Sequence, residues 1–238
     1  MYSICYGDKE IKFTLIRKNV KNINLTVKPN SEVVVSANND VPLEYINEFV
    51  YSKAKWIDRN LSYYKKTENI EQGVKEYVNG ESFRYLGRQY RLKVFESSKE
   101  LVKYFRGYLH LYTEDLDDYN EKQLLIEKWY EERSRIIFKD SLDRMHNVVK
   151  PYDIEYPTLD IRKMRSRWGS CYPESNKIIL NSSLIKAPKD CIDYVVLHEL
   201  IHFKYKNHTN EFYRLLDILM PDWRDKKKIL DEVVVREL

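Results

Sequence analysis

The chain has 238 residues, which is long enough for one large domain or two small ones with a buried core. Its residues are 43% hydrophobic and 33% charged, as in a globular protein, and 41 basic against 37 acidic side chains give a net charge of +4. This mild excess does not by itself indicate a nucleic-acid partner. No stretch approaches the run of about 18 apolar residues that a membrane span requires, so a membrane partner is not expected.

The N-terminus and the cysteines bear on the cellular compartment. Residues 1–10 lack the charged and then apolar build of a secretory signal. Three cysteines, Cys5, Cys171 and Cys191, leave one unpaired in any disulfide scheme and are too few for a disulfide-stapled secreted domain. We expect reduced thiols and, by default, a cytoplasmic protein.

The first third of the chain favours short strands followed by a helix. Strands are predicted at residues 12–16, 23–27 and 33–37, with turn signals between them. From residue 43 to about 64 the apolar residues recur at the spacing of one helix face. A helix packed on a small sheet is the simplest structure for this region.

The middle of the chain favours hairpins. Asn79-Gly80 and Leu86-Gly87 are typical turn pairs. The strands predicted around and after these turns lie near residue 77 and at residues 83–86, 90–95, 101–105 and 108–112.

An acidic stretch at residues 114–120 then precedes a helical pattern from residue 121 to about 148. We place an internal boundary in that stretch. It gives an N-terminal strand-rich region with one helix at residues 1–115 and a C-terminal core at residues 116–238.

The last third alternates between strands and a helix. Strands are predicted at residues 158–162 and 177–181, and residues 167–171 are interpreted as a turn between them. A helix begins at Ala187 or Pro188, because proline suits the start of a helix. The elements together predict an α+β protein.

Three of the five histidines, His198, His202 and His208, fall within eleven residues. The first two stand at i and i+4, so both imidazoles project from one side of a helix and can bind one tetrahedral metal ion. The helix is apolar over much of its surface, which indicates that it lies in the core beneath a cleft. This spacing predicts a site for one Zn²⁺ ion.

Glu199 follows the first of these histidines. One residue corresponds to about 100° of helical turn, so Glu199 can lie over the metal without binding it. Zinc lowers the pKa of a bound water from about 15.7 toward 7, which leaves a carboxylate able to take the proton and pass it to a leaving amine. Glu199 is therefore the candidate general base and then general acid.

A catalytic zinc site needs a third protein ligand and one open position. His208 is the better candidate, because residues 203–207 can end the helix and bring the chain back across the ion. Glu211 is the competing candidate, since a glutamate from further along the chain can also complete such a site. The preference of zinc for nitrogen ligands favours His208.

These motifs resemble the YgjP-like metallopeptidases, a bacterial and archaeal branch of the zincins. The resemblance is carried by His-Glu-x-x-His at residues 198–202 and by the later Asn207-His208. Arg167-Trp168-Gly169-Ser170-Cys171 before them and Pro221-Asp222-Trp223 after them stand in the expected order. The likeness is specific over residues 162–230 and looser over residues 19–60.

The resemblance implies a zincin-like catalytic core in the C-terminal region, a peptidase activity and a peptide or protein substrate. It maps the metal ligands onto His198, His202 and His208. In zincins an edge strand near the metal binds the substrate backbone as an added strand, and residues 177–181 are the candidate here.

Further residues are candidates for contacts with the substrate. Tyr194 and Tyr205 can donate a hydrogen bond to a developing oxyanion, although packing is the alternative in a chain with 20 tyrosines. Arg165 and Arg167 can anchor a substrate carboxylate or a nucleic-acid phosphate, the alternative being solvated or fold-supporting charges.

Two other functions remain open. The first is a non-catalytic binding protein with a structural zinc, in which Cys171 or Cys191 supplies a fourth ligand and Glu199 has no role. The second is a nucleic-acid-associated protein with a protease-like fold, whose affinity for DNA or RNA falls steeply with rising salt. Nothing in the sequence indicates the oligomeric state.

Overall fold

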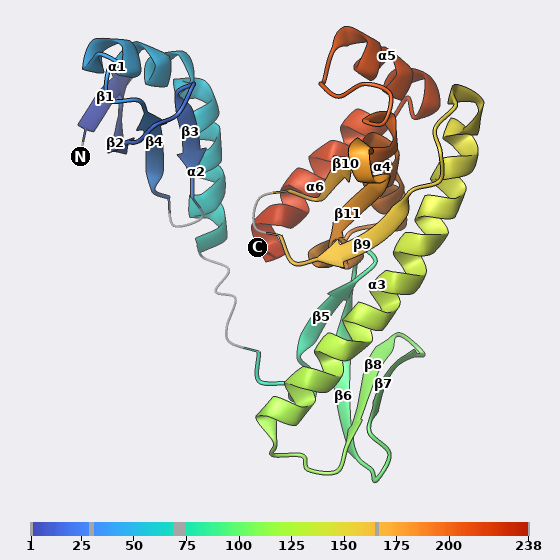
Figure 1. Ribbon diagram of the computed structural model, residues 1–238. Helices are drawn as coiled ribbons and strands as arrows, with labels where there is room; N and C mark the ends of the chain where they lie inside the picture. Colours follow the sequence, from blue (N-terminus) through green and yellow to red (C-terminus); the bar gives the residue numbers. More distant parts are fainter. Residues whose placement is uncertain (1, 29–30, 69–74, 165–166, 238) are drawn as a thin grey trace. The chain divides into compact units, whose positions relative to one another are not determined.

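The computed structural model describes residues 2–28, 31–68, 75–164 and 167–237. Packing divides the chain into two compact units, Met1–Gly73 and Val74–Leu238 (Figure 1). The described ranges contain three small mixed sheets and six α-helices, which confirms the predicted α+β class. None of the helices in those ranges combines the length and the apolar character needed to cross a membrane.

The first unit consists of a four-stranded sheet with the order β1-β2-β4-β3, followed by two helices. Its elements are β1 (Tyr2–Tyr6), β2 (Lys9–Arg17), β3 (Asn24–Val27), β4 (Val33–Ala37), α1 (Leu43–Ser52) and α2 (Ala54–Glu68). Its core is formed by residues such as Phe13, Val35, Ile46 and Ile57, each almost fully buried. The single helix predicted from residue 43 to about 64 is divided at Lys53, and the sequence does not predict β1.

The second unit begins with another four-stranded sheet, with the order β5-β6-β8-β7, and a long helix that packs against it. These elements are β5 (Ser82–Tyr85), β6 (Arg88–Glu96), β7 (Leu101–Phe105), β8 (Tyr108–Thr113) and α3 (Tyr119–Val149). Asp118 caps α3, because its side chain accepts a hydrogen bond from the backbone N–H of Glu121 at 3.0 Å.

The rest of the second unit is a three-stranded sheet, with the order β10-β11-β9, and three further helices. Its elements are β9 (Thr158–Arg162), β10 (Gly169–Tyr172), β11 (Lys177–Asn181), α4 (Lys189–Ile201), α5 (Asn210–Leu219) and α6 (Trp223–Glu237). Helix α3 contacts the strands β7, β8 and β9 and packs most extensively on α4, so it joins both sheets into one body (Figure 1).

The units divide at residues 73/74, whereas the sequence predicts a boundary at 115/116. The reason is that the sheet β5–β8 shares one apolar core with α3 and α4, in which Leu92, Leu109 and Leu197 are fully buried. The turn between β5 and β6 also bonds to the segment before α4, with the N–H of Gly87 2.9 Å from the carbonyl of Lys186. The acidic stretch is therefore a loop inside the second unit.

The strand predictions near the histidine motif need two corrections. Residues 169–172 form β10, which pairs antiparallel with β11, so the interpretation of residues 167–171 as a turn is wrong. The strand at residues 177–181 exists but is the central one, paired with β10 on one side and β9 on the other. It cannot be the substrate-binding edge, because both of its edges are already paired; its nearly continuous apolar run is typical of a central strand.

Candidate metal centre

Helix α4 holds the candidate ligands on a buried scaffold. Its start at Lys189 follows Pro188, and its apolar residues, among them Val196 and Leu197, are fully buried. Asp193 fixes α4 to α3, because its carboxylate accepts hydrogen bonds from the Ser141 hydroxyl at 2.5 Å and the Arg144 guanidinium at 2.7 Å. The helix that presents the histidines is thereby tied to the longest helix of the protein.

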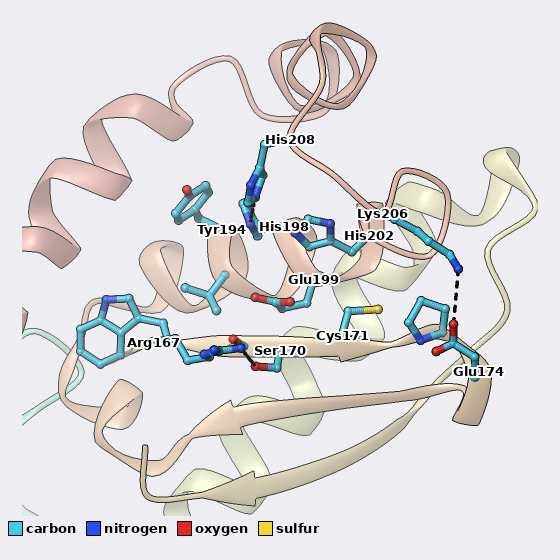
Figure 2. A pocket seen from close by; sticks show the side chains of 14 residues that line it. Arg167, Ser170, Cys171, Glu174, Tyr194, His198, Glu199, His202, Lys206 and His208 are labelled. Atoms are coloured by element: carbon cyan, nitrogen blue, oxygen red, sulfur yellow. Dashed lines mark hydrogen bonds and ion pairs between the residues drawn. The ribbon is translucent and has the colours of Figure 1, made fainter. Parts of the chain in front are cut away.

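Three imidazoles converge above the C-terminal end of α4. Each of His198, His202 and His208 offers one ring nitrogen, and these three atoms lie within 4.8 Å of one another (Figure 2). The Nε2 atoms of His198 and His208 are 2.9 Å apart. In the described part of the chain, this group of His, Cys, Asp or Glu side chains is the one with metal-binding geometry.

The chain reversal after α4 orients two of these rings. Nδ1 of His202 lies 3.0 Å from the backbone carbonyl of Tyr205, and an N–H donated there leaves Nε2 free to face the other histidines. Thr209 then caps α5, accepting a hydrogen bond from the N–H of Phe212 at 3.4 Å. The start of α5 therefore fixes the backbone next to His208.

Phe212 packs against the histidine cluster. This residue is fully buried, and its ring centroid lies 4.9 Å from that of His198 and 4.8 Å from those of His202 and His208. An aromatic ring in contact with all three imidazoles limits their rotation. The sequence gives no sign of this contact, because no local pattern relates residue 212 to the histidines.

The donor set fits a zinc ion. Tetrahedral zinc with nitrogen bonds of about 2.0–2.1 Å separates two ligand nitrogens by about 3.3 Å, a few tenths of an ångström more than the observed 2.9 Å. Burial, followed by the charges of His202 and His208, lowers the pKa of His198 to about 3, so its ring is neutral at pH 7, which is the form that binds metals. The buried Nδ1 of His198 has no hydrogen-bond partner among the described residues.

Glu199 lies between the histidines and strand β10 (Figure 2). It is only 6% exposed, and burial raises its pKa to about 8, with the charge of Arg167 acting in the opposite direction. A Cβ atom built on Gly169 would lie 2.7 Å from both Cγ and Oε1 of Glu199. Glycine at the start of β10 is therefore needed because the carboxylate packs directly against the strand backbone.

Asn181, at the end of β11, holds the segment that leads into β10. Its fully buried side-chain amide donates to the carbonyls of Met164 at 2.9 Å and Arg167 at 3.0 Å. Its own backbone N–H donates to the carbonyl of Trp168 at 2.8 Å. These bonds fix the position of Gly169, and through it the wall against which Glu199 rests.

The histidines and Glu199 line a pocket of about 540 Å³, together with residues of β10 and the segments around it. Tyr194 and Arg167 both line this pocket. Tyr194 is buried, with its ring stacked on that of Trp223 at 6.1 Å, and burial raises the pKa of its hydroxyl. Arg167 is exposed and donates to the Ser170 hydroxyl at 3.2 Å.

Tyr205 and Glu211 lie outside the ligand group of the three histidines. Tyr205 does not line the pocket and contributes its carbonyl to His202 rather than its hydroxyl. Glu211 is an exposed residue in the first turn of α5, where the Thr209 side chain lowers the pKa of its carboxyl. Arg165 lies outside the described residues.

Cys171 and Cys191, the candidates for a fourth ligand, do not belong to the ligand group of the three histidines. Cys191 is buried, and its thiol lies 3.7 Å from the carbonyl of Lys226. Cys171 lines the pocket, but burial, followed by the charge of Glu199, raises its pKa to about 12. The arrangement thus leaves three nitrogen donors facing an open pocket, as a catalytic rather than a closed structural site requires.

Comparison with known proteins gives a family match over most of the chain. Residues 21–233 match the family described as YgjP-like, metallopeptidase domain. No curated protein matches the chain.

Solved structures that are similar to part of the chain include two metallopeptidase zymogens. One is the crystal structure of the metallopeptidase zymogen of Pyrococcus abyssi abylysin, which is 21% identical, with 42% of this chain and 93% of that chain covered and a TM-score of 0.36. The other is the crystal structure of the metallopeptidase zymogen of Methanocaldococcus jannaschii jannalysin. It is 24% identical, with 40% of this chain and 96% of that chain covered and a TM-score of 0.35. Because the family match spans residues 21–233 and includes every residue of the histidine cluster, the chain belongs to the YgjP-like family, in its metallopeptidase domain.

Proposed function

We propose that the protein hydrolyses peptide bonds in peptides or proteins at a single zinc ion held by His198, His202 and His208. The observation that carries this proposal is the convergence of three imidazole nitrogens within 4.8 Å beside a carboxylate in the same pocket. The chemistry that zinc supplies when bound is Lewis acidity, which polarises a carbonyl and acidifies water.

Glu199 is the group that moves the proton in this proposal. One of its carboxylate oxygens takes the proton of the attacking water and later delivers it to the nitrogen of the departing amine. Its burial excludes bulk water, and the close backing by Gly169 prevents the side chain from moving away from the histidines. The positive charge of a bound zinc ion would oppose the effect of burial on the pKa of Glu199 and favour its ionised form, so that a carboxylate held in this way can make both transfers with little reorganisation.

The substrate backbone has a place beside this carboxylate. Within the described residues, β10 pairs only with β11 and so presents a free edge along the pocket. An extended peptide can add to that edge through backbone hydrogen bonds. Tyr194 and Arg167, on the walls of the same pocket, are the candidates for contacts with the oxyanion and with a substrate carboxylate.

The first test compares the parent protein with Glu199→Gln. The metal content of each is measured by mass spectrometry, and cleavage is measured on an unbiased peptide library. We expect zinc to stay bound in both and cleavage to fall by about 10²–10⁴-fold in the variant. Glu211→Gln is the matched control, because Glu211 is exposed and belongs neither to the pocket lining nor to the histidine group; it should retain activity.

The outcomes distinguish a zinc peptidase from a non-catalytic protein that binds zinc. Equal cleavage by the parent and Glu199→Gln would exclude Glu199 as the proton carrier. Intact peptides with both proteins at full zinc occupancy would instead favour the non-catalytic binding protein. Removal of the metal with a chelator, followed by addition of single metals, identifies the ion that restores cleavage.

A further inference from the structure

The sheet β5–β8 has two chemically different faces. Leu92, Leu109 and Leu111 point into the core shared with α3 and are fully buried. The alternate positions of the strands point to the other side, which we call the outer face. Where β6, β7 and β8 pair with one another, it consists of Arg91, Lys93, Phe95, Leu101, Lys103, Phe105, Tyr108, His110 and Tyr112.

Aromatic rings cover the centre of the outer face. Phe95 stacks on His110 at 5.3 Å and on Tyr112 at 5.2 Å, and Phe105 meets His110 edge-on at 5.8 Å. These rings remain open to solvent, with Phe95 38%, Phe105 48% and Tyr108 36% exposed. A ring cluster that is not needed to fill a core provides flat apolar surfaces to a ligand.

Positive charges are interleaved with these rings. Lys93 Nζ lies 3.9 Å from the ring centroid of Tyr108, and Lys103 Nζ lies 4.9 Å from that of Tyr112. In the turn after β7, the Arg106 guanidinium lies 5.1 Å from the ring of Phe105. None of the nine residues of the outer face is acidic. The charge complements a polyanion, although the net charge of the whole chain is only +4.

His110 adds to the aromatic rather than the cationic character of this face. Burial, followed by the charges of Lys93 and Lys103, lowers the pKa of its imidazole. A neutral ring in the middle of the cluster can stack without repelling the flanking lysines.

The combination distinguishes between classes of ligand. Unpaired bases stack on aromatic side chains while cations between the rings neutralise the phosphates, and this tolerates any base sequence. A nucleic-acid duplex keeps its base faces hidden, and an acidic peptide offers charge but few flat rings. From these contacts we propose that the outer face of the sheet β5–β8 binds single-stranded nucleic acid. None of its residues lines the pocket of the metal centre, so this proposal does not depend on peptidase activity.

The direction of charge along the face indicates where the phosphates lie. Arg106 lies in the turn between β7 and β8, next to the paired residues Phe105 and Tyr108. Two residues further along the strands, Lys93 and Lys103 pair with His110 from its two sides. Beyond the other end of β8 comes the acidic run that starts at Glu114. The backbone of the bound strand should therefore cross the sheet at the Arg106 end.

The test measures the affinity of the full chain for fluorescein-labelled oligo(U), oligo(dT) and a duplex by fluorescence anisotropy over a range of salt. We expect both single strands to bind more tightly than the duplex, and their ratio shows whether RNA or DNA is preferred. Phe105→Leu keeps apolar area but removes the ring, and should weaken single-strand binding by about 5- to 100-fold. Lys93→Gln/Lys103→Gln should reduce the slope of log K against log salt by about 1.4.

The control removes the same charge elsewhere. Lys128→Gln/Lys189→Gln takes two exposed lysines from α3 and α4 and should leave the affinity nearly unchanged. Circular dichroism and thermal melting of every variant establish that it is folded. No binding of single strands, equal loss in the control, or unchanged affinity of Phe105→Leu would overturn the proposal. Equal affinity for polyglutamate or for phosphatidylserine vesicles would overturn it too, because the face would then bind any polyanion.

Discussion

The contact between Glu199 and Gly169 shows how closely the site depends on single residues. The carboxylate fills the space in which any other residue at position 169 would place its Cβ atom. Phe212 has a similar role for the imidazoles, since one ring touches all three. Both residues act by shape, without donating a proton or binding a metal.

Gly169→Ala tests this dependence. The added methyl group would lie 2.7 Å from Oε1 of Glu199, so the carboxylate must move or the strand must shift. We expect peptide cleavage to fall by about 100-fold, as for other small displacements of a catalytic group, at a cost of about 1–3 kcal/mol in stability. Zinc content should stay at the parental level, because the three atoms nearest to the added methyl group all belong to Glu199 and none to a histidine.

Ser170→Ala is the neighbouring control for this experiment. It keeps the backbone of β10 and removes only a hydroxyl, which accepts from Arg167 and donates to the carbonyl of Gly169. Activity near the parental level in Ser170→Ala and a large loss in Gly169→Ala would fit the steric argument. Full activity in Gly169→Ala would show that the Glu199 side chain can shift to accommodate the methyl group without losing its function.

Among the secondary-structure elements, β10 is held at its start by the side-chain amide of Asn181 as well as by its pairing with β11. Asn181 joins the end of β11 to the chain before β10 by two side-chain bonds to carbonyls, those of Met164 and Arg167. Asn181→Leu has nearly the same size but leaves both carbonyls without this donor. We expect a loss of about 1–3 kcal/mol in the free energy of unfolding, measured by urea denaturation, together with reduced peptide cleavage.

Asn60→Ala provides the comparison. Asn60 lies on α2, where its amide donates to the carbonyl of Trp56 in the same helix. This change should alter the free energy of unfolding by less than about 0.5 kcal/mol. If Asn181→Leu were as mild, β10 would be positioned mainly by its pairing with β11.

The elements also show which parts of this structure a sequence can reveal. The strands at residues 158–162 and 177–181 and the long helix were predicted closely, because hydrophobic periodicity is a local signal. The histidines at i and i+4 were recognisable for the same reason. Strand β10 was missed because it starts with glycine, which favours turns, and its short polar sequence shows no alternation.

Contacts between distant residues explain the remaining differences. The backing of Glu199 by Gly169 joins residues 30 positions apart, and no local pattern marks it. The sequence predicts residues 177–181 as the edge of the sheet, whereas these residues form the central strand. The order of strands in a sheet depends on contacts between distant segments, so the sequence of one strand does not reveal it. The two units divide at residues 73/74 rather than at 115/116, because Leu92 and Leu109 share a core with helices that follow them in the chain.

At the scale of the whole molecule, the described residues form one apolar core in each unit. The metal centre lies entirely within the second. In calorimetry of the full chain we expect two transitions, and zinc at 100 times its dissociation constant should stabilise only the second unit, by about 2.7 kcal/mol. For a unit of this size the midpoint should rise by roughly 5–11 °C.

His202→Ala should abolish this shift while leaving the transition of residues 1–73 in place. A zinc-dependent rise of both midpoints would mean that the two cores unfold together. An equal rise in His202→Ala would place the stabilising ion somewhere other than the histidine cluster.

The three cysteines differ in solvent exposure, so their rates of alkylation can report on the unfolding of the protein. Cys5 is exposed on β1, whereas Cys171 is half-buried and Cys191 is buried, and burial raises the pKa of both latter thiols to about 12. Because the thiolate is the form that reacts, iodoacetamide at pH 8 should modify Cys5 quickly and the other two only when their surroundings open. The number of alkyl groups added in increasing urea, counted on the intact mass, then follows the opening of the second unit without any introduced probe.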